Sequence, residues 1–311
     1  MIIVTGATGK LGRRIVEHLL SRVPAREIGV SVRDPEKARG LTDRGVRVRR
    51  GSFTDPGGLA HAFEGATQVL VVSVDKMGDE AVHQHRTAID GAVAAGARRI
   101  LYTSHMGAAA TSCFQACRDH AATEDALRAS GVPFTSLRNG FYTASTVQFL
   151  NPVLAGGGEI ALPADGPVSW TTHDDLAEAA AVILAEEGRF DGPTPPLTAT
   201  QALTLDDAAK LATQATGRTI TRAVAPDDLF RERLVGRGVP AEAADHLLGI
   251  FAASRAGEFA AVDPTLTTLL GREPTGLGAF LRRECADGRD QVETAAERHR
   301  DSGDGGEPTG H

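Results

Sequence analysis

The stretch MIIVTGATGKLGRRIVEHLL, residues 1–20, decides how the chain folds. A short apolar run leads into a turn with glycines at Gly6, Gly9 and Gly12, and a segment with helical spacing follows. In a strand–turn–helix unit, Gly6 makes the tight turn, Gly9 lets backbone N–H groups approach a pyrophosphate, and Gly12 lets helix and strand pack closely. The sequence therefore predicts a dinucleotide at the positive end of this helix.

Apolar runs and helical stretches alternate over the first 140 residues. The expected strands are Ile2–Thr5, Ile28–Val32, Val46–Arg49, Val69–Val74, Arg99–Thr103 and Phe134–Leu137. This alternation predicts an α/β fold, a doubly wound parallel sheet with helices on both faces. Later helical patterns, starting with Phe141–Leu154, dominate the rest. We expect a dinucleotide-binding domain over 1–140, a smaller, mostly helical substrate-binding part over 141–285 that interleaves with it, and a flexible polar tail over 286–311.

Composition places the chain among soluble globular proteins, since 41% of its 311 residues are apolar and 23% are charged. No apolar segment reaches the ~20 residues that a membrane-spanning helix needs. We find no signal-peptide pattern, and the three cysteines have no disulfide-framework spacing. A cytoplasmic protein without a membrane partner is expected.

Charge is unevenly distributed along the chain. Residues 1–50 hold 12 Lys and Arg against 5 Asp and Glu, although the whole chain carries a net charge of −7. The basic end favours an anionic ligand, or it is simply a solvated surface rich in arginine. The acidic total makes nucleic acid an unexpected partner.

The residue after the second expected strand indicates which dinucleotide binds. Dinucleotide folds usually place an acidic residue there, about 20 positions after the glycine turn, to bind the adenosine ribose. Here Arg33 follows that strand, 21 positions after Gly12. A guanidinium suits a 2′-phosphate, which it can bind through two hydrogen bonds, and Lys37 adds a second cation. The sequence favours NADP(H) over NAD(H), while Asp34 could bind the ribose or cap the helix starting at Pro35.

Five segments carry a family likeness. They read VTGATGKLG, VRDPEKA, QHRTAIDGAVAAGARRILYTS, ATEDALRASGVPFTSLRNGFY and DDLAEAAAVIL. Together they resemble the NmrA-like group of atypical short-chain dehydrogenases/reductases, above all its NAD(P)H:quinone oxidoreductase and triphenylmethane reductase branch. The resemblance runs from Met1 to about Leu281. It implies a Rossmann domain of strand order 3-2-1-4-5-6, a small C-terminal substrate domain, and NADPH-dependent reduction of quinones, dyes or similar conjugated molecules.

The resemblance also implies which residues contact the cofactor. It places at the phosphates and adenine Thr8, Gly9, Lys10, Leu11, Arg33, Ser52 and Phe53. It places beside the nicotinamide Val72, Ser73, Thr103, Ser104, Arg138, Asn139, Gly140, Phe141 and Tyr142. Together with Gly6, Gly12 and Lys37, these residues are the predicted cofactor site.

The proton donor of typical short-chain dehydrogenases, a Tyr-x-x-x-Lys dyad, is absent from the chain. In its place are His120 and Glu124, spaced so that the carboxylate could orient the imidazole and raise its pKa. His120 could donate a proton, bind substrate, or be an ordinary paired helix histidine. His105 follows the fifth strand, where sites in such sheets gather. The candidate catalytic residues are His120, His105 and Tyr142.

Weaker patterns leave alternatives open. Cys113 and Cys117 could be a redox pair or two free thiols. The aromatic residues that could form a pocket for a flat acceptor, or could equally be core, are Phe114, Phe141, Tyr142, Phe149 and Trp170. No group of residues has metal-ligand spacing, so no metal is expected.

Three functions stay open at this point. The favoured one is an NADPH-dependent reductase that transfers hydride to a quinone-like or other conjugated small-molecule acceptor. A rival is a non-catalytic NAD(P)-sensing regulatory protein, which the absent dyad supports. The third is a tailoring reductase or isomerase for one metabolite. Homodimer formation is also open.

Overall fold

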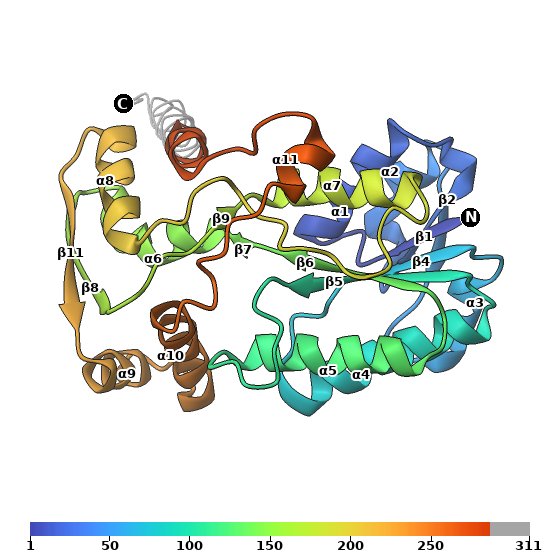
Figure 1. Cartoon of the computed structure of the whole chain (residues 1–311), viewed down its shortest axis with the longest axis horizontal. Helices are drawn as coiled ribbons and strands as arrows, with labels where there is room; N and C mark the ends of the chain where they lie inside the picture. The colour runs from blue at the N-terminus through green and yellow to red at the C-terminus, as the bar shows by residue number, and fades with distance from the viewer. Residues whose placement is uncertain (287–311) are drawn as a thin grey trace, which may run out of the picture.

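A computed structural model describes residues 1–286 of the protein. The expected flexible tail therefore lies outside the described residues, apart from Ala286. Figure 1 shows the large sheet and its helices around the N-terminus, beside a smaller group of helices that contains a two-stranded sheet. The strands start near the N-terminus and run toward the smaller group, so their carboxyl ends face it (Figure 1).

The large sheet has seven parallel strands in the order β10-β6-β5-β4-β1-β2-β3. They are β1 (Ile2–Thr5), β2 (Ile28–Val32), β3 (Arg47–Arg50), β4 (Gln68–Val71), β5 (Arg99–His105), β6 (Phe134–Asn139) and β10 (Gly192–Pro193). The predicted α/β class and the order 3-2-1-4-5-6 are confirmed. All six expected strands agree with the observed ones within three residues at each end. The first two match fully, and β3 is shifted by one residue. A two-residue Gly-Pro strand carries no pattern that could have predicted β10.

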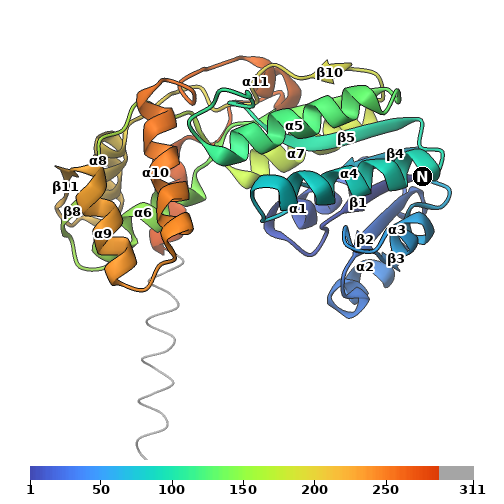
Figure 2. The same cartoon turned by 90° about the horizontal axis from the view of Figure 1, so that it is seen from below.

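Helices cover both faces of this sheet, as Figure 2 shows from below. On one face lie α1 (Lys10–Leu20), α2 (Arg39–Thr42), α7 (His173–Ala185) and α11 (Thr265–Leu270). On the other lie α3 (Pro56–Phe63), α4 (Gly78–Ala94) and α5 (Gln115–Ala129). Two short 3₁₀ turns span Ala25–Glu27 and Pro35–Ala38.

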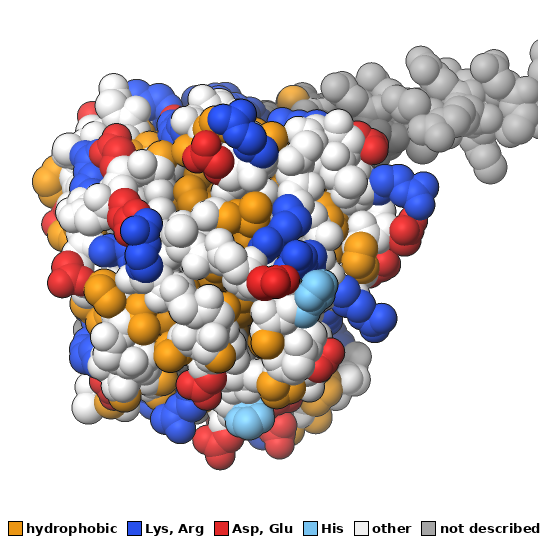
Figure 3. All heavy atoms as spheres, turned by 90° about the vertical axis from the view of Figure 1, so that its right-hand side faces the viewer, with side chains coloured by type: hydrophobic (Ala, Val, Ile, Leu, Met, Phe, Trp, Pro, Cys, Tyr) orange, Lys and Arg blue, Asp and Glu red, His pale blue; other side chains and the backbone are white. Residues whose placement is uncertain are grey.

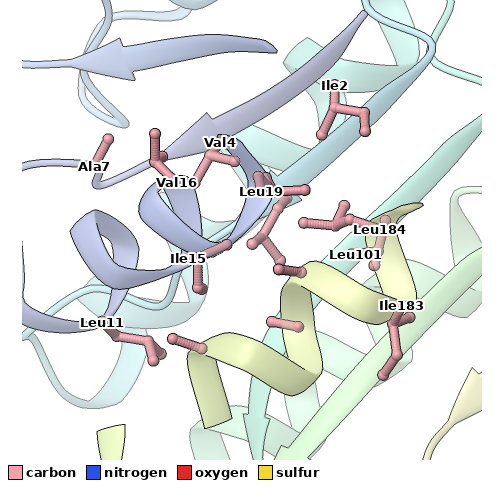
Figure 4. Packing of buried hydrophobic residues seen from close by; sticks show 14 of the residues in the cluster. Ile2, Val4, Ala7, Leu11, Ile15, Val16, Leu19, Leu101, Ile183 and Leu184 are labelled. Carbon is pink, nitrogen blue, oxygen red and sulfur yellow. The ribbon is translucent and has the colours of Figure 1, made fainter. Parts of the chain in front are cut away.

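Helix α7 comes from late in the sequence, yet it completes the first face of the sheet. Ile15 and Leu19 of α1 are fully buried, and Ile183 and Leu184 of α7 are almost so. These side chains point into one core with residues of β1 and β5 (Figure 4). Burying apolar side chains of this size contributes about 2 kcal/mol each. The early and late parts of the chain therefore share one core.

The smaller group has its own apolar core. Its helices are α6 (Ala144–Leu154), α8 (Leu205–Thr216), α9 (Asp227–Gly236) and α10 (Ala241–Arg255). Two parallel strand pairs accompany them: β8 (Gly158–Pro163) with β11 (Ile220–Ala225), and β7 (Phe141–Tyr142) with β9 (Trp170–Thr171). The helix expected over Phe141–Leu154 begins later than predicted, because β7 uses its first two residues for pairing. Arg222 of β11 and Asp165, just after β8, form a buried ion pair at 2.8 Å.

A buried carboxylate joins β5, β6 and α5. Glu124 is 1% exposed, and its Oε1 accepts hydrogen bonds from the hydroxyls of Ser104 and Ser136, both at 2.8 Å. Its Oε2 accepts one from Arg138 Nη2 at 2.7 Å. A buried charge held by this many donors is stable only while its partners stay in place.

Replacing this carboxylate should be costly. In Glu124→Ala, two hydroxyls and a guanidinium lose their acceptor, and we expect the free energy of unfolding to fall by about 3 kcal/mol. Urea unfolding followed by circular dichroism measures the change. Glu17→Ala is the control, because it removes an exposed pair with Arg44 and should cost under about 1 kcal/mol. Equal losses in both variants would contradict the assignment.

Candidate dinucleotide and acceptor site

The glycine turn after β1 has the geometry that a phosphate site needs. Gly6 has φ +61°, which favours glycine, and its carbonyl accepts the N–H of Gly9 at 2.9 Å. A Cβ on Gly12 would lie 2.3 Å from the Gly6 carbonyl oxygen. No side chain longer than hydrogen fits there, so the roles predicted for Gly6 and Gly12 agree with the local packing.

The N-terminus of α1 is open to an anion. Its N-cap is Gly9, which supplies no side-chain cap, and the first turn contains no acidic residue. The first N–H groups of a helix carry partial positive charge and attract phosphate when no side chain satisfies them. Thr8 and Lys10 are exposed around this end, whereas Leu11 is buried in the core beneath it.

Two cations stand at the carboxyl end of β2. Arg33 and Lys37 are exposed, and within residues 1–286 neither side chain has a hydrogen bond or ion pair. Asp34 caps the following turn, since its Oδ1 accepts the N–H of Glu36 at 3.2 Å. Of the two roles left open for Asp34, the structure therefore shows the cap.

Some other basic residues of the first 50 form ion pairs on the surface. Arg44 contacts Glu17 at 2.7 Å, and Arg49 contacts Glu64 at 2.9 Å. Figure 3 shows Lys and Arg interspersed with Asp and Glu on the face at the right of Figure 1. These paired residues fit the interpretation of a solvated surface rich in arginine, and an anionic ligand at Arg33 and Lys37 stays a prediction.

The carboxyl ends of β4 and β5 are tied together. The Ser73 N–H donates to Thr103 Oγ1 at 2.8 Å, and that hydroxyl donates to Ser73 Oγ at 3.2 Å. The Val72 N–H donates to Thr5 Oγ1 at 2.8 Å. These bonds fix the edge of the sheet on which the nicotinamide half is predicted to lie.

The predicted adenine neighbours lie beyond β3. Ser52 Oγ contacts Thr54 Oγ1 at 2.8 Å, and Phe53 packs against the core under α3. Their contact with adenine stays a prediction.

Buried polar atoms without partners gather where β6 leaves the sheet. Asn139 Oδ1 and Thr143 Oγ1 are both buried and unpaired among the described residues. The Gly140 N–H donates to Leu197 O at 2.8 Å, and a Cβ at Gly140 would lie 2.3 Å from Thr171 Oγ1. Unpaired buried polar atoms are rare and call for a ligand, water or ion. Sequence analysis missed Thr143, which no motif marked.

The neighbouring side chains of Phe141 and Tyr142 lie in different surroundings. The ring of Tyr142 stacks on His173 at the start of α7, with centroids 4.0 Å apart. Burial raises the pKa of Tyr142, while Asn139 lowers it. Phe141 instead lies among aromatic rings, 5.5 Å from Trp170 and 5.0 Å from Phe259.

The expected aromatic group is therefore only partly assembled. Phe114, Phe141 and Trp170 belong to one cluster, which Phe259 completes. Phe149 packs on Phe251 elsewhere in the smaller core. No local pattern predicted Phe259, because it is brought in from far along the chain.

The expected pairing of His120 with Glu124 is wrong. Glu124 faces β5 and β6 and is engaged by the hydroxyls and guanidinium described above, whereas His120 Nδ1 lies 2.7 Å from the hydroxyl of Tyr102. Burial, together with His105 and His85, holds the pKa of His120 well below its usual value. Of the alternatives for His120, the structure shows a paired helix histidine whose partner is a tyrosine. A role toward substrate stays a prediction.

Tyr102 and His85 are the neighbours that sequence analysis missed. His85 Nε2 accepts the N–H of Val74 at 3.0 Å, and its Nδ1 lies 3.0 Å from Thr123 Oγ1. A signal existed, because His85 interrupts the otherwise apolar stripe of α4. Burial lowers the pKa of His85 to about 4 and raises that of Tyr102.

His105 ends β5 within the aromatic cluster. Its Nδ1 accepts the N–H of Gly107 at 3.0 Å and lies 3.2 Å from Cys117 Sγ. Burial lowers its pKa to about 4. Cys117 is buried while Cys113 is exposed, and both are free thiols.

Taken together, these features fit a dinucleotide. In the described part of the chain, the turn leaves no room for a side chain at Gly12 and the N-terminus of α1 has no side-chain cap. Two cations at the end of β2 have no partner there, and unpaired buried oxygens lie where β6 ends. Within residues 1–286 no cluster of three His, Cys, Asp or Glu could hold a metal ion. No helix in that range has the length and apolar character needed to cross a bilayer.

Fold and site define an α/β dinucleotide-binding protein. The model of the NmrA-like family matches residues 1–281, and the chain belongs to that family. It is 34% identical over 277 residues to quinone oxidoreductase 2 of Escherichia coli K12, spanning 89% of this chain and 96% of that protein.

Solved structures agree with this assignment. The E. coli QOR2 structure with NADPH superimposes with a TM-score of 0.85 at 32% identity, covering 91% of this chain and 99% of that one. The triphenylmethane reductase of Citrobacter sp. with NADP(H) gives 0.83 at 34% identity, covering 92% and 100%.

The buried neutral histidines predict acid sensitivity. The pKa of an unfolded histidine is near 6.5, whereas burial lowers the pKa of His85 in the folded chain to about 4. The unfolded state therefore binds more protons between these values, so stability is intact above pH 6.5 and falls on acidification toward pH 4. The expected slope from His85 alone is about 1.4 kcal/mol per pH unit within this window.

Urea unfolding at a series of pH values tests this slope. His85→Gln keeps an amide near its partners but cannot titrate, so its curve should be shallower. His83→Gln, which changes an exposed histidine of the same helix, should keep the native slope. A native slope in His85→Gln would contradict the prediction.

Proposed function

We propose that the protein transfers hydride from NADPH to a quinone-like or other conjugated small-molecule acceptor. The chain is an oxidoreductase that uses NADP(H), in keeping with relatives whose structures hold this cofactor. The acceptor class is the proposed step, supported by relatives named quinone oxidoreductase, triphenylmethane reductase and azoreductase. The observation that carries the proposal is the pair of free cations, Arg33 and Lys37, at the end of β2.

In this proposal each part of the sheet edge holds one part of the cofactor. The turn from Gly6 to Gly12 and the open end of α1 bind the pyrophosphate, and Arg33 with Lys37 binds the 2′-phosphate. Val72, Ser73 and Thr103 support the nicotinamide half, and Asn139 offers its unpaired oxygen there. Bound NADPH would supply the hydride.

The chain's own residues position the acceptor against the nicotinamide and exclude water from the site. The aromatic cluster of Phe114, Phe141, Trp170 and Phe259 lies next to the carboxyl end of β5, where a flat acceptor would meet the nicotinamide. Proximity and orientation of this kind account for a large part of rate enhancement in cofactor enzymes. A quinone needs little acid assistance, because its reduced form is a stabilised phenolate, so the absent Tyr-Lys dyad is compatible with the reaction.

NADPH oxidation with a panel of quinones tests the function. We expect turnover with at least one quinone, and this turnover should require both NADPH and the quinone. The loss of NADPH absorbance measures it. Tight binding of NADPH without turnover of any quinone or dye would overturn the proposal.

A change at Arg33 tests the cofactor preference. Arg33→Ala removes a charge-assisted contact worth about 1.5–3 kcal/mol, so the Kd for NADPH should rise about 10- to 100-fold while that for NADH changes little. Fluorescence titration with both cofactors measures the two constants. Arg26→Ala, at the opposite end of β2, is the matched control and should leave both unchanged. Equal losses for the two cofactors would contradict the role of Arg33.

One observation favours a second candidate, an NAD(P)-sensing regulatory protein: the chain lacks the Tyr-Lys dyad. A sensor should bind oxidised and reduced cofactor with comparable affinity and co-purify with a regulatory partner. A reductase should turn over instead. A tailoring enzyme would differ in accepting only one member of the acceptor panel.

A further inference from the structure

Two imidazoles near the end of β5 present N–H groups that no atom of residues 1–286 accepts. For His105 the backbone decides the tautomer, since the Gly107 N–H can only donate and therefore needs Nδ1 to be an acceptor. The thiol of Cys117 lies against the same nitrogen at 3.2 Å. A neutral ring in this state carries its proton on Nε2. That Nε2 is buried and has no partner among the described residues.

A chain of hydrogen bonds orients His120 in the same way. The Val74 N–H donates to His85 Nε2, which leaves the His85 proton on Nδ1, facing Thr123 Oγ1. The Thr123 hydroxyl donates to the Asp119 carbonyl at 2.8 Å and accepts from His85.

Tyr102 is the last residue of this series of hydrogen bonds before His120. The Tyr102 oxygen lies 3.4 Å from His85 Nδ1 and 2.7 Å from His120 Nδ1, its shorter contact. We assign the phenol proton to that shorter contact. His120 then also carries its proton on Nε2, which has no partner within residues 1–286.

The two rings form a pair. Their centroids are 6.1 Å apart and their planes differ by 23°. His105 is surrounded by the rings of Phe114, Phe141 and Phe259, at 6.4, 5.5 and 5.2 Å. The His105 donor thus lies among apolar rings, where a hydrogen bond to an anion is stronger than in water, and the His120 ring stacks beside it.

The charged groups around the pair keep both rings neutral. Glu258 raises the pKa of His105, but burial outweighs it and gives about 4. His120 faces His105 and His85, which disfavour its charge, and Glu124 is occupied by Arg138. Asp119 Oδ2 accepts the Gly78 N–H, and its Oδ1 accepts from Gln115. A neutral imidazole donates a hydrogen bond without being an acid at neutral pH.

We propose that His105 and His120 together donate hydrogen bonds to the acceptor oxygen that becomes anionic during reduction. This rests on the proposed function and names its acceptors as carbonyl compounds of the quinone type. Hydride from NADPH, which becomes NADP⁺, adds to the quinone with its electron pair, and negative charge develops on a carbonyl oxygen. The two N–H groups stabilise that charge, and water then supplies the proton. Both imidazoles keep their own protons throughout.

Tyr102 and His85 are positioning residues in this arrangement. Tyr102 contacts His120, and His85 contacts Tyr102. Through Tyr102 they fix which nitrogen of His120 carries the proton, as a second hydrogen-bonding partner commonly does for a functional histidine. Tyr102→Phe deletes one oxygen atom and leaves the ring, so it tests this role with little disturbance of packing.

A phenolate probe tests the donor pair without catalysis. With the protein saturated in NADP⁺, 4-nitrophenol is titrated across pH, and its absorbance reports the pKa of the bound phenol. The wild-type protein should lower this pKa by favouring phenolate. His120→Leu and Tyr102→Phe should bind phenolate at least about 10-fold more weakly, with neutral phenol less affected. His83→Leu, an exposed histidine outside the site, should behave like the wild type. An unchanged phenolate affinity in both His120→Leu and Tyr102→Phe would overturn the proposal.

Kinetics with 1,4-naphthoquinone give the second arm. Loss of one donor to a developing oxyanion costs about 10²-fold in kcat in other enzymes, and we expect that scale for His120→Leu with an unchanged Kd for NADPH. His120→Gln, which retains an N–H donor, should recover part of the loss. The wild-type kcat should stay flat between pH 6 and 8, because both rings remain neutral there. A bell-shaped profile lost on changing His120 would show an acid instead and overturn the proposal.

The two proposals fail differently. A wild-type protein that binds phenolate through His120 but reduces no quinone would refute the proposed function and keep the donor pair. If the variants His120→Leu and Tyr102→Phe both reduce quinones as well as the wild-type protein does, the donor pair alone is refuted.

Discussion

The close approach of α1 to the turn after β1 is the constraint on which the rest of the structure depends. A Cβ at Gly12 would lie 2.3 Å from the Gly6 carbonyl, so only glycine lets the helix begin there. That start places the N–H groups of α1 at the sheet edge and directs Ile15 and Leu19 against α7. One steric condition thus sets both the phosphate-binding end and the packing that supports it.

Local chemistry allowed most of the sheet to be predicted. Alternating apolar runs and glycine turns located six strands, because a buried parallel strand is apolar along its whole length. The parallel pair of β8 and β11 was not predicted, since its residues are exposed in part and lie about sixty positions apart, so no local pattern links them. The short strand β10 depends on pairing with β6 alone.

The candidate site, like the sheet, has some features that the sequence could predict and others that it could not. The glycine spacing and the position of Arg33 follow from the backbone, and both could be predicted. The partner of His120 could not: helical spacing correctly put Glu124 on a neighbouring position, but two serine hydroxyls and Arg138, brought by β5 and β6, compete for that carboxylate. Tyr102, from inside β5, takes its place beside the imidazole. Such competition is decided by tertiary contacts, which spacing along one helix does not contain.

The return of α7 to the large sheet has a consequence for how such proteins can diversify. The chain leaves the sheet after β6, builds part of the smaller group, returns as α7, leaves again, and returns once more as α11 (Figure 1). A fragment ending at residue 140 would expose the apolar face of α1. The smaller group that faces the acceptor therefore cannot be exchanged between relatives as a separate segment unless α7 and α11 are exchanged together with it.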